Sequence, residues 1–243
     1  MNPDRKKRVE MIAADVRKRW GTKALDARGA ATLSSRVQVI PSGFPSLDRA
    51  LGINGIPRSY VTEFWGTPTS GIVTIALKII ASAQSSGDVA AYLDMNESLD
   101  ADYASRCDVD LNKLLLIRPQ PKEKSLEMLY DLVKKRGVGI IVFDSLTTFS
   151  KPPDKLTMVL RRINRALAES GCALIFVSSS PRGMLSHEAA VRLSIQRKHW
   201  LERQGDIYGY VSQITVTKNN FSPSGRKLLV SLDFEGVVLG DAA

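Results

Sequence analysis

The 243-residue sequence predicts an α/β fold, a mostly parallel β-sheet flanked by helices, with antiparallel strands at its C-terminal edge and an N-terminal helical arm. Three observations support this prediction. From residue 42 onward, short apolar runs alternate with stretches of helical periodicity. The run Val138–Asp144 is almost continuously apolar, which is typical of a parallel strand covered on both faces. After residue 190, polar and apolar residues alternate between turns, as in antiparallel strands.

Residues 1–35 predict a basic arm followed by a linker. Apolar residues recur at helical spacing over residues 4–20, Gly21 is typical of a helix end, and residues 22–35 are rich in Ala, Gly, Ser and Thr. An isolated helix of this length is marginal in water, so its apolar stripe needs a partner surface. The candidates for this surface are the same protein's core, a second copy or a partner protein. The stripe residues expected to bind it are Val9, Ile12, Val16 and Trp20.

Residues 36–243 predict one core domain. A short half-buried strand is expected at Arg36–Ile40. The strands expected next are Tyr60–Trp65, Asp88–Asp94, Leu114–Ile117, Val138–Asp144 and Ala173–Ser178. The helices expected between them are 72–86, 100–107, 125–136 and 154–170. The antiparallel strands expected at the end are Val191–Gln196, Tyr208–Thr217 and Lys227–Asp233, with turns at Gly205 and at Ser222–Gly225.

Composition narrows the function classes. The formal net charge of +9 and the pI near 9.6 favour a polyanionic partner, nucleic acid first. No stretch approaches the ~18 apolar residues of a membrane span, and no apolar segment follows the basic N-terminus as in a secretory signal. Cys107 and Cys172 are expected to be buried thiols in a reducing cytoplasm, and two isolated histidines do not indicate a metal site.

The segment between the first long strand and its helix is either a damaged phosphate loop or simply a glycine-containing strand-to-helix turn. A working loop reads Gly-x-x-x-x-Gly-Lys-Ser/Thr. Gly66 and Gly71 stand at the correct spacing, but Ile72 occupies the lysine position and Val73 the hydroxyl position. The lysine neutralises the β- and γ-phosphates, and the hydroxyl holds the metal ion that bridges them. Each such charge-assisted bond contributes about 1.5–3 kcal/mol, so we expect no ATPase activity and no cofactor.

Further motifs carry a resemblance to the bacterial RecA recombinase family over residues 5–240. The segments that resemble RecA in order and spacing are Ser42–Gly52, Gly55–Glu63, Asp94–Asp100, Val142–Ser145 and Val216–Asn220. The resemblance implies a RecA-like core. It also implies that Gly66, Gly71, Thr74, Tyr103 and Asp144 are vestiges of the nucleotide site. Tyr103 matches the position that stacks on adenine in RecA, and we interpret it here as core packing.

The departures from RecA are concentrated in the catalytic machinery. RecA's catalytic glutamate aligns with Asn96, and its nucleotide-sensing glutamine aligns with Ser179. One member of a basic pair that reaches a neighbouring subunit remains as Lys218, and we count it as partner-binding. The two segments that match RecA's DNA-binding loops are short, and a RecA-type C-terminal domain is not expected.

These observations leave two function hypotheses. The first is a non-catalytic pseudo-ATPase that serves as an accessory or adaptor in DNA repair, recombination or translesion synthesis, as ImuA-type factors do. Its expected partners are a RecA-like recombinase or a repair polymerase complex. The second is an ATP-independent DNA-binding module, whose basic residues would be Arg182, Arg192, Arg197, Lys198 and Arg203. A residual ATPase with a relocated lysine is disfavoured, because Lys78 lies nearly two helical turns beyond Ile72.

Overall fold

A computed structural model describes residues 11, 12, 14, 15, 18, 19, 37–145, 156–179, 185 and 187–242. The chain forms two compact units, Met1–Arg36 and Val37–Ala243. The described residues of the first unit are helical, and Met11 and Ile12 expose their side chains there. Val9, Val16 and Trp20 lie outside the described residues, so docking through this stripe stays a prediction.

The second unit is built on a large mixed β-sheet, which has nine strands in the part of the chain that the structure describes. Its strands follow the order β11-β10-β9-β8-β3-β7-β6-β4-β5. In this order, the strands from β11 through β8 pair antiparallel with their neighbours, and those from β8 through β5 pair in parallel. The strands are β3 (Val61–Gly66), β4 (Ala90–Asp94), β5 (Leu114–Ile117), β6 (Ile140–Asp144), β7 (Ala173–Ser178), β8 (Val191–Arg203), β9 (Asp206–Asn219), β10 (Lys227–Asp233) and β11 (Val238–Ala242). The predicted fold class is therefore confirmed.

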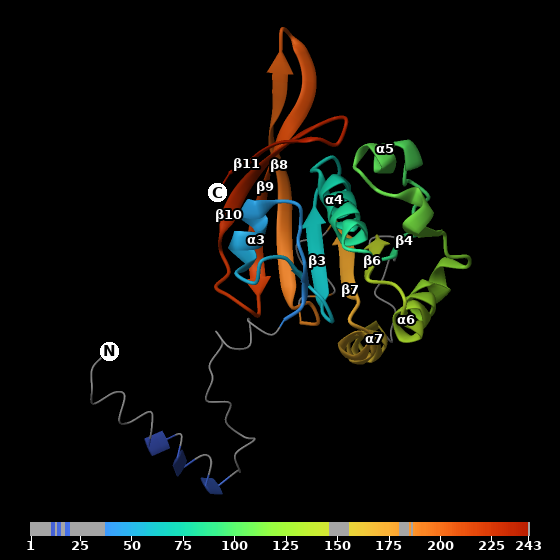
Figure 1. Cartoon of the computed structure of the whole chain (residues 1–243), viewed down its shortest axis with the longest axis vertical. Coiled ribbons are helices and arrows are strands. Elements are labelled where there is room, and N and C mark those ends of the chain that lie inside the picture. The colour runs from blue at the N-terminus through green and yellow to red at the C-terminus, as the bar shows by residue number, and fades with distance from the viewer. Residues whose placement is uncertain are drawn as a thin grey trace. The chain divides into compact units, whose positions relative to one another are not determined.

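Helices cover both faces of this sheet (Figure 1). One buried cluster joins the sheet to α3 (Pro45–Leu51), α4 (Ile72–Ser85) and α5 (Ala101–Arg106). A second joins the opposite face to α6 (Ser125–Lys135) and α7 (Leu156–Ser170). Apolar side chains alternate between the two clusters along the strands, as the sheet's pleat requires. Short 3₁₀ turns lie at Leu111–Lys113 and Lys122–Lys124.

The structure differs from the sequence prediction at the margins of the core. The strand expected at Arg36–Ile40 is reduced to β1 (Val39–Ile40), which pairs with β2 (Ile56–Pro57) outside the main sheet. Helix α3 was not predicted, although Pro45 begins it and Gly52, at φ 71°, ends it. Strand β11 was also missed.

Strands β8 and β9 form a hairpin that is longer than predicted and extends beyond the rest of the sheet (Figure 1). Both faces of its tip are exposed, so the alternation that marks a half-buried strand is lost over residues 197–207. Cys107 and Cys172 are both buried and free, as expected. Among the described helices, none is both long enough and apolar enough to cross a membrane.

Candidate functional site at the degenerate phosphate loop

The carboxyl ends of the central parallel strands surround a cavity of about 490 Å³. The loop Gly66–Gly71, between β3 and α4, forms one side of it. Asn96 and Ser98 follow β4, Asp144 ends β6 and Ser178 ends β7, and all of them line the cavity. Ligands generally bind at this edge of a parallel α/β sheet. The strand topology therefore brings the positions that the sequence pointed to together at a typical ligand site.

Both glycines of the loop have a packing role that involves no nucleotide. Gly71 has φ 86°, and a Cβ at this position would lie 2.8 Å from Cε2 of Tyr210. A Cβ on Gly66 would overlap the carbonyl oxygen of Ile195 on the paired strand β8. The glycine spacing of the motif therefore follows from the close approach of β8 and β9 to the loop.

The two altered positions make the start of α4 apolar. Ile72 is 7% exposed and belongs to the buried cluster, and Val73 packs against that cluster. Both line the cavity, and among the described residues that line it there is no lysine, arginine or histidine. Lys78 cannot supply the missing charge, because its Nζ pairs with Asp108 Oδ2 at 2.7 Å.

Thr74 holds two tyrosines together beneath the loop. Its Oγ1 lies 2.7 Å from Oη of Tyr103 and 3.0 Å from Oη of Tyr210. Burial raises the pKa of both phenols, so they are neutral hydrogen-bonding groups at physiological pH. Tyr103 also packs against the main buried cluster, and its hydroxyl faces the protein interior.

Asp144 is buried, and its surroundings are acidic. Its Oδ2 accepts a hydrogen bond from Oη of Tyr92 at 2.5 Å, and burial raises the pKa of the Asp144 carboxyl. Asp94 is the paired residue on β4 and accepts hydrogen bonds from the backbone N–H groups of Ser98 and Leu99. Glu97, next to Asn96, is exposed. The described residues contain no cluster of three or more metal-ligating side chains.

The sequence analysis missed an aromatic wall on the hairpin side of the cavity. Trp200 and Tyr210 are paired residues on β8 and β9, and Phe234 follows β10. The three rings have centroid separations of 6.2–6.3 Å. A signal was available, because Trp200 and Tyr210 are equidistant from Gly205, the predicted turn of an antiparallel pair.

The hairpin is also fastened to the phosphate loop by polar contacts. Arg197 donates to Oγ1 of Thr69 at 2.8 Å, and its guanidinium carbon lies 3.8 Å from the ring centroid of Trp200. Ser212 donates to the carbonyl oxygen of Ser70 at 2.7 Å. Side chains of β8 and β9 thus restrain the loop on the hairpin side.

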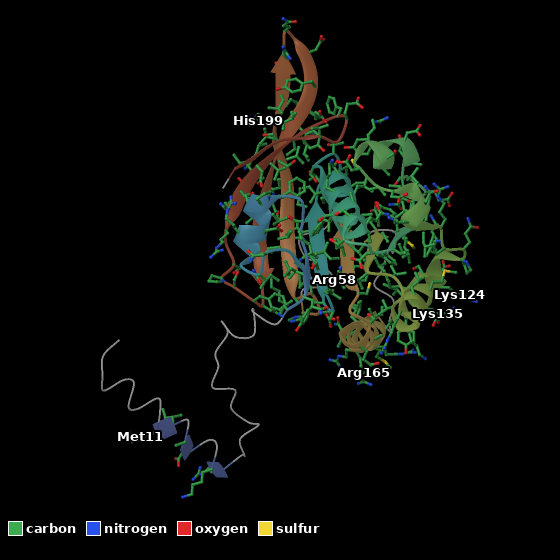
Figure 2. All side chains as sticks on the ribbon, viewed as in Figure 1. Met11, Arg58, Lys124, Lys135, Arg165 and His199 are labelled. Atoms are coloured by element: carbon green, nitrogen blue, oxygen red, sulfur yellow. The ribbon has the colours of Figure 1, made fainter. Side chains whose placement is uncertain are left out.

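The predicted DNA-binding residues that the structure describes differ in their surroundings. Arg197, Lys198 and Arg203 lie on β8, where Figure 2 also shows His199 on the hairpin. Arg192 lies at the other end of β8 and its Nε donates to Oε2 of buried Glu63 at 2.5 Å. Arg182 lies outside the described residues.

The two remaining predicted positions lie on different elements. Lys218, on β9, is paired with Arg192 in the sheet register and donates to the carbonyl oxygen of His187. Burial lowers the pKa of the Lys218 ammonium group, with a contribution from the Arg192 charge. Ser179 is exposed at the edge of the cavity, beside Ser178.

Comparisons with known proteins agree on one family. The family model for the RecA N-terminal domain matches residues 7–179. RecA of Mycolicibacterium smegmatis is 33% identical over 251 residues, which cover 91% of this chain and 72% of that protein. RecA of Symbiobacterium thermophilum is 29% identical over 253 residues, with coverages of 92% and 72%. The solved structure of the RadB recombinase superposes with a TM-score of 0.65 at 17% identity, covering 81% of this chain and 97% of that one.

Proposed function

Because this chain belongs to the RecA family, and this relationship supports a role in DNA repair or recombination, we propose that it acts in one of these processes as a non-catalytic accessory or adaptor protein. Translesion synthesis is a further process in which such an adaptor would act. The observation that carries this proposal is the apolar pair Ile72–Val73 where a phosphate loop needs a cation and a metal ligand. The adaptor would act through contacts with a recombinase or a repair polymerase.

The surroundings of the cavity support the same proposal. A triphosphate carries several negative charges, and the part of the lining that the structure describes offers it the carboxylate of Asp144 and no basic side chain. An anion placed there would meet electrostatic repulsion with no compensating ion pair. Asn96, at the position that orients the attacking water in RecA, provides no carboxylate base.

The first prediction is that the protein does not hydrolyse ATP. With magnesium present, phosphate release should stay at the background rate whether or not single-stranded DNA is added, because the cation, the metal ligand and the base are all replaced. The measurement is a phosphate-release assay on the full chain, run beside the Asp144→Ala variant. Turnover that the Asp144→Ala change abolishes would show that the site is catalytic and that the proposal is wrong.

A second candidate function, ATP-independent DNA binding, is favoured by the basic hairpin. Arg197, Lys198 and Arg203 lie on β8, and Lys198 and Arg203 are exposed. Phosphate contacts of this kind carry no sequence information. Such binding would therefore be electrostatic and indifferent to base sequence.

The second prediction tests this candidate by its salt dependence. For single-stranded DNA, each phosphate contact should steepen the fall of log K with log salt by about 0.7. Changing Lys198 and Arg203 to glutamate should therefore flatten the salt dependence and weaken binding, measured by fluorescence anisotropy of a labelled oligonucleotide. The matched control changes Lys124 and Lys135, which lie near and on α6 (Figure 2). An equal loss in both double variants would place no DNA site on the hairpin.

A further inference from the structure

The mouth of the cavity exposes aromatic surface that the described residues of this unit leave uncovered. Trp200 and Phe234 line the cavity and are 39% and 43% exposed, respectively. Tyr208 and Ile207, on the same hairpin, are also exposed. Soluble monomers rarely expose large clusters of apolar side chains, and where they do, the cluster usually marks a binding site.

The chemistry of the hollow indicates the kind of group that fits it. Ile72, Val73, Val177 and Pro68 line it together with the three aromatic rings, so most of its wall is apolar. Its volume of about 490 Å³ exceeds that of a single side chain and is typical of a pocket that receives an anchor residue with its neighbouring backbone. Ser179, exposed at its edge, offers a hydroxyl group to an amide of such a backbone.

The charges beside the mouth are divided between its two sides. On the hairpin side, Arg197 is held over the ring of Trp200 and Lys198 is the next residue on β8, whereas Arg203 lies farther along the strand beside exposed Glu202 and is paired in register with Asp206. On the opposite side, Glu97 is exposed and Asp100 caps α5 by accepting from the N–H groups of Asp102 and Tyr103. An acidic segment is therefore attracted along the hairpin and repelled from the β4–α5 side.

We propose that the former nucleotide cavity is a docking socket for an acidic peptide segment of a partner protein, which inserts one aromatic or large aliphatic side chain beside Trp200 and Phe234. The acidic residues that flank the anchor lie beside Arg197 and Lys198. This inference rests on the proposed adaptor function and gives that function its binding site. The loss of the lysine and its replacement by Ile72 then serve the socket, since a charge at its base would oppose an apolar anchor.

Charge also distinguishes the proposed occupant from the chain's own arm. Residues 4–20 contain seven lysines and arginines and three acidic residues. A segment with this excess of positive charge is repelled by Arg197 and Lys198 beside the mouth. The charge pattern thus favours a foreign acidic segment over the arm of a second copy.

The test uses phage-displayed random dodecapeptides selected on the full-length protein. Peptides recovered by the wild-type chain should share an aromatic or large aliphatic residue flanked by aspartate or glutamate. The same selection on a Ser179→Trp variant should not recover them, because an indole at this exposed edge position blocks the cavity. Binding of a recovered peptide should weaken by roughly tenfold or more in the Trp200→Ala variant, as for an aromatic hot spot.

The matched control is Leu115→Ala on β5, at the opposite end of the sheet, where Leu115 is similarly exposed. This variant should bind the recovered peptide as the wild type does. Circular dichroism of each variant establishes that a lost signal is not lost folding. An alanine substitution of the peptide's anchor residue should abolish binding to the wild-type chain.

Three outcomes would overturn the inference. One is the recovery of the same peptides by the wild type and the Ser179→Trp variant, and another is the recovery of basic or anchorless peptides. The third is a failed selection together with binding of oligo(dT) that depends on Trp200, which would make this surface a nucleic-acid site. ATP turnover would refute the proposed function instead, so the two failures are distinguishable.

Discussion

Replacement of Arg192 by methionine is expected to lower the free energy of unfolding by about 3 kcal/mol, within the range for breaking a buried ion pair. Glu63 is fully buried and depends on two groups, with Oε2 accepting from Arg192 and Oε1 accepting from Oγ of Ser178 at 3.1 Å. Without the guanidinium, the carboxylate must stay charged with weaker compensation or take up a proton. Denaturant unfolding followed by circular dichroism measures the loss.

A double variant separates the charge effect from lost packing. Changing Glu63 to leucine together with Arg192→Met removes both charges, and most of the stability should return because an apolar pair of similar volume needs no compensation. The matched single control is Arg203→Met, since Arg203 is exposed on the same strand. If Arg192→Met and Arg203→Met unfold at the same denaturant concentration, the buried pair does not stabilise the core.

Replacement of Gly66 by alanine is the second change expected to be severe, at about 3 kcal/mol, the upper end of the usual range for overpacking. The new methyl group would overlap the carbonyl oxygen of Ile195, which is a backbone atom and cannot rotate away. The β3–β8 pairing must therefore open locally. Thermal unfolding of the variant should show a lower midpoint, irrespective of any added nucleotide.

Gly240→Ala, on β11, is the control for Gly66→Ala. A Cβ on Gly240 would meet Ser231 at ordinary van der Waals distance, the nearest atom being 3.7 Å away. This variant should unfold close to the wild-type midpoint. Equal midpoints for the two variants would mean that the loop glycine is not required by packing against β8.

The parallel core could be predicted from sequence because its signals are local. The parallel strands Leu114–Ile117 and Ala173–Ser178 were predicted with the bounds they have in the structure, since apolar runs there end at turns or charged residues, and so was the antiparallel strand Lys227–Asp233. The loop Gly66–Gly71 was located by its spacing alone. By contrast, the outer part of the β8–β9 hairpin has no buried face, so periodicity gave no information about its length.

The full set of residues that form the site could be identified only from the tertiary structure. Asn96, Asp144 and Ser179 were placed at one site by their resemblance to RecA, and parallel-strand topology brings them to the same cavity. Arg192 could not be separated from Arg197 by sequence, because both are basic residues of one strand. Only the fold shows that Arg192 is paired with Glu63 in the interior.

The attachment of the phosphate loop to the hairpin has a consequence for affinity. In a loop that becomes ordered only around its ligand, part of the interaction energy offsets the lost backbone entropy. Here Arg197, Ser212 and Tyr210 restrain the loop and its helix before anything enters the cavity. The entropy of ordering this wall is lost during folding, so a small contact surface could support a long-lived complex.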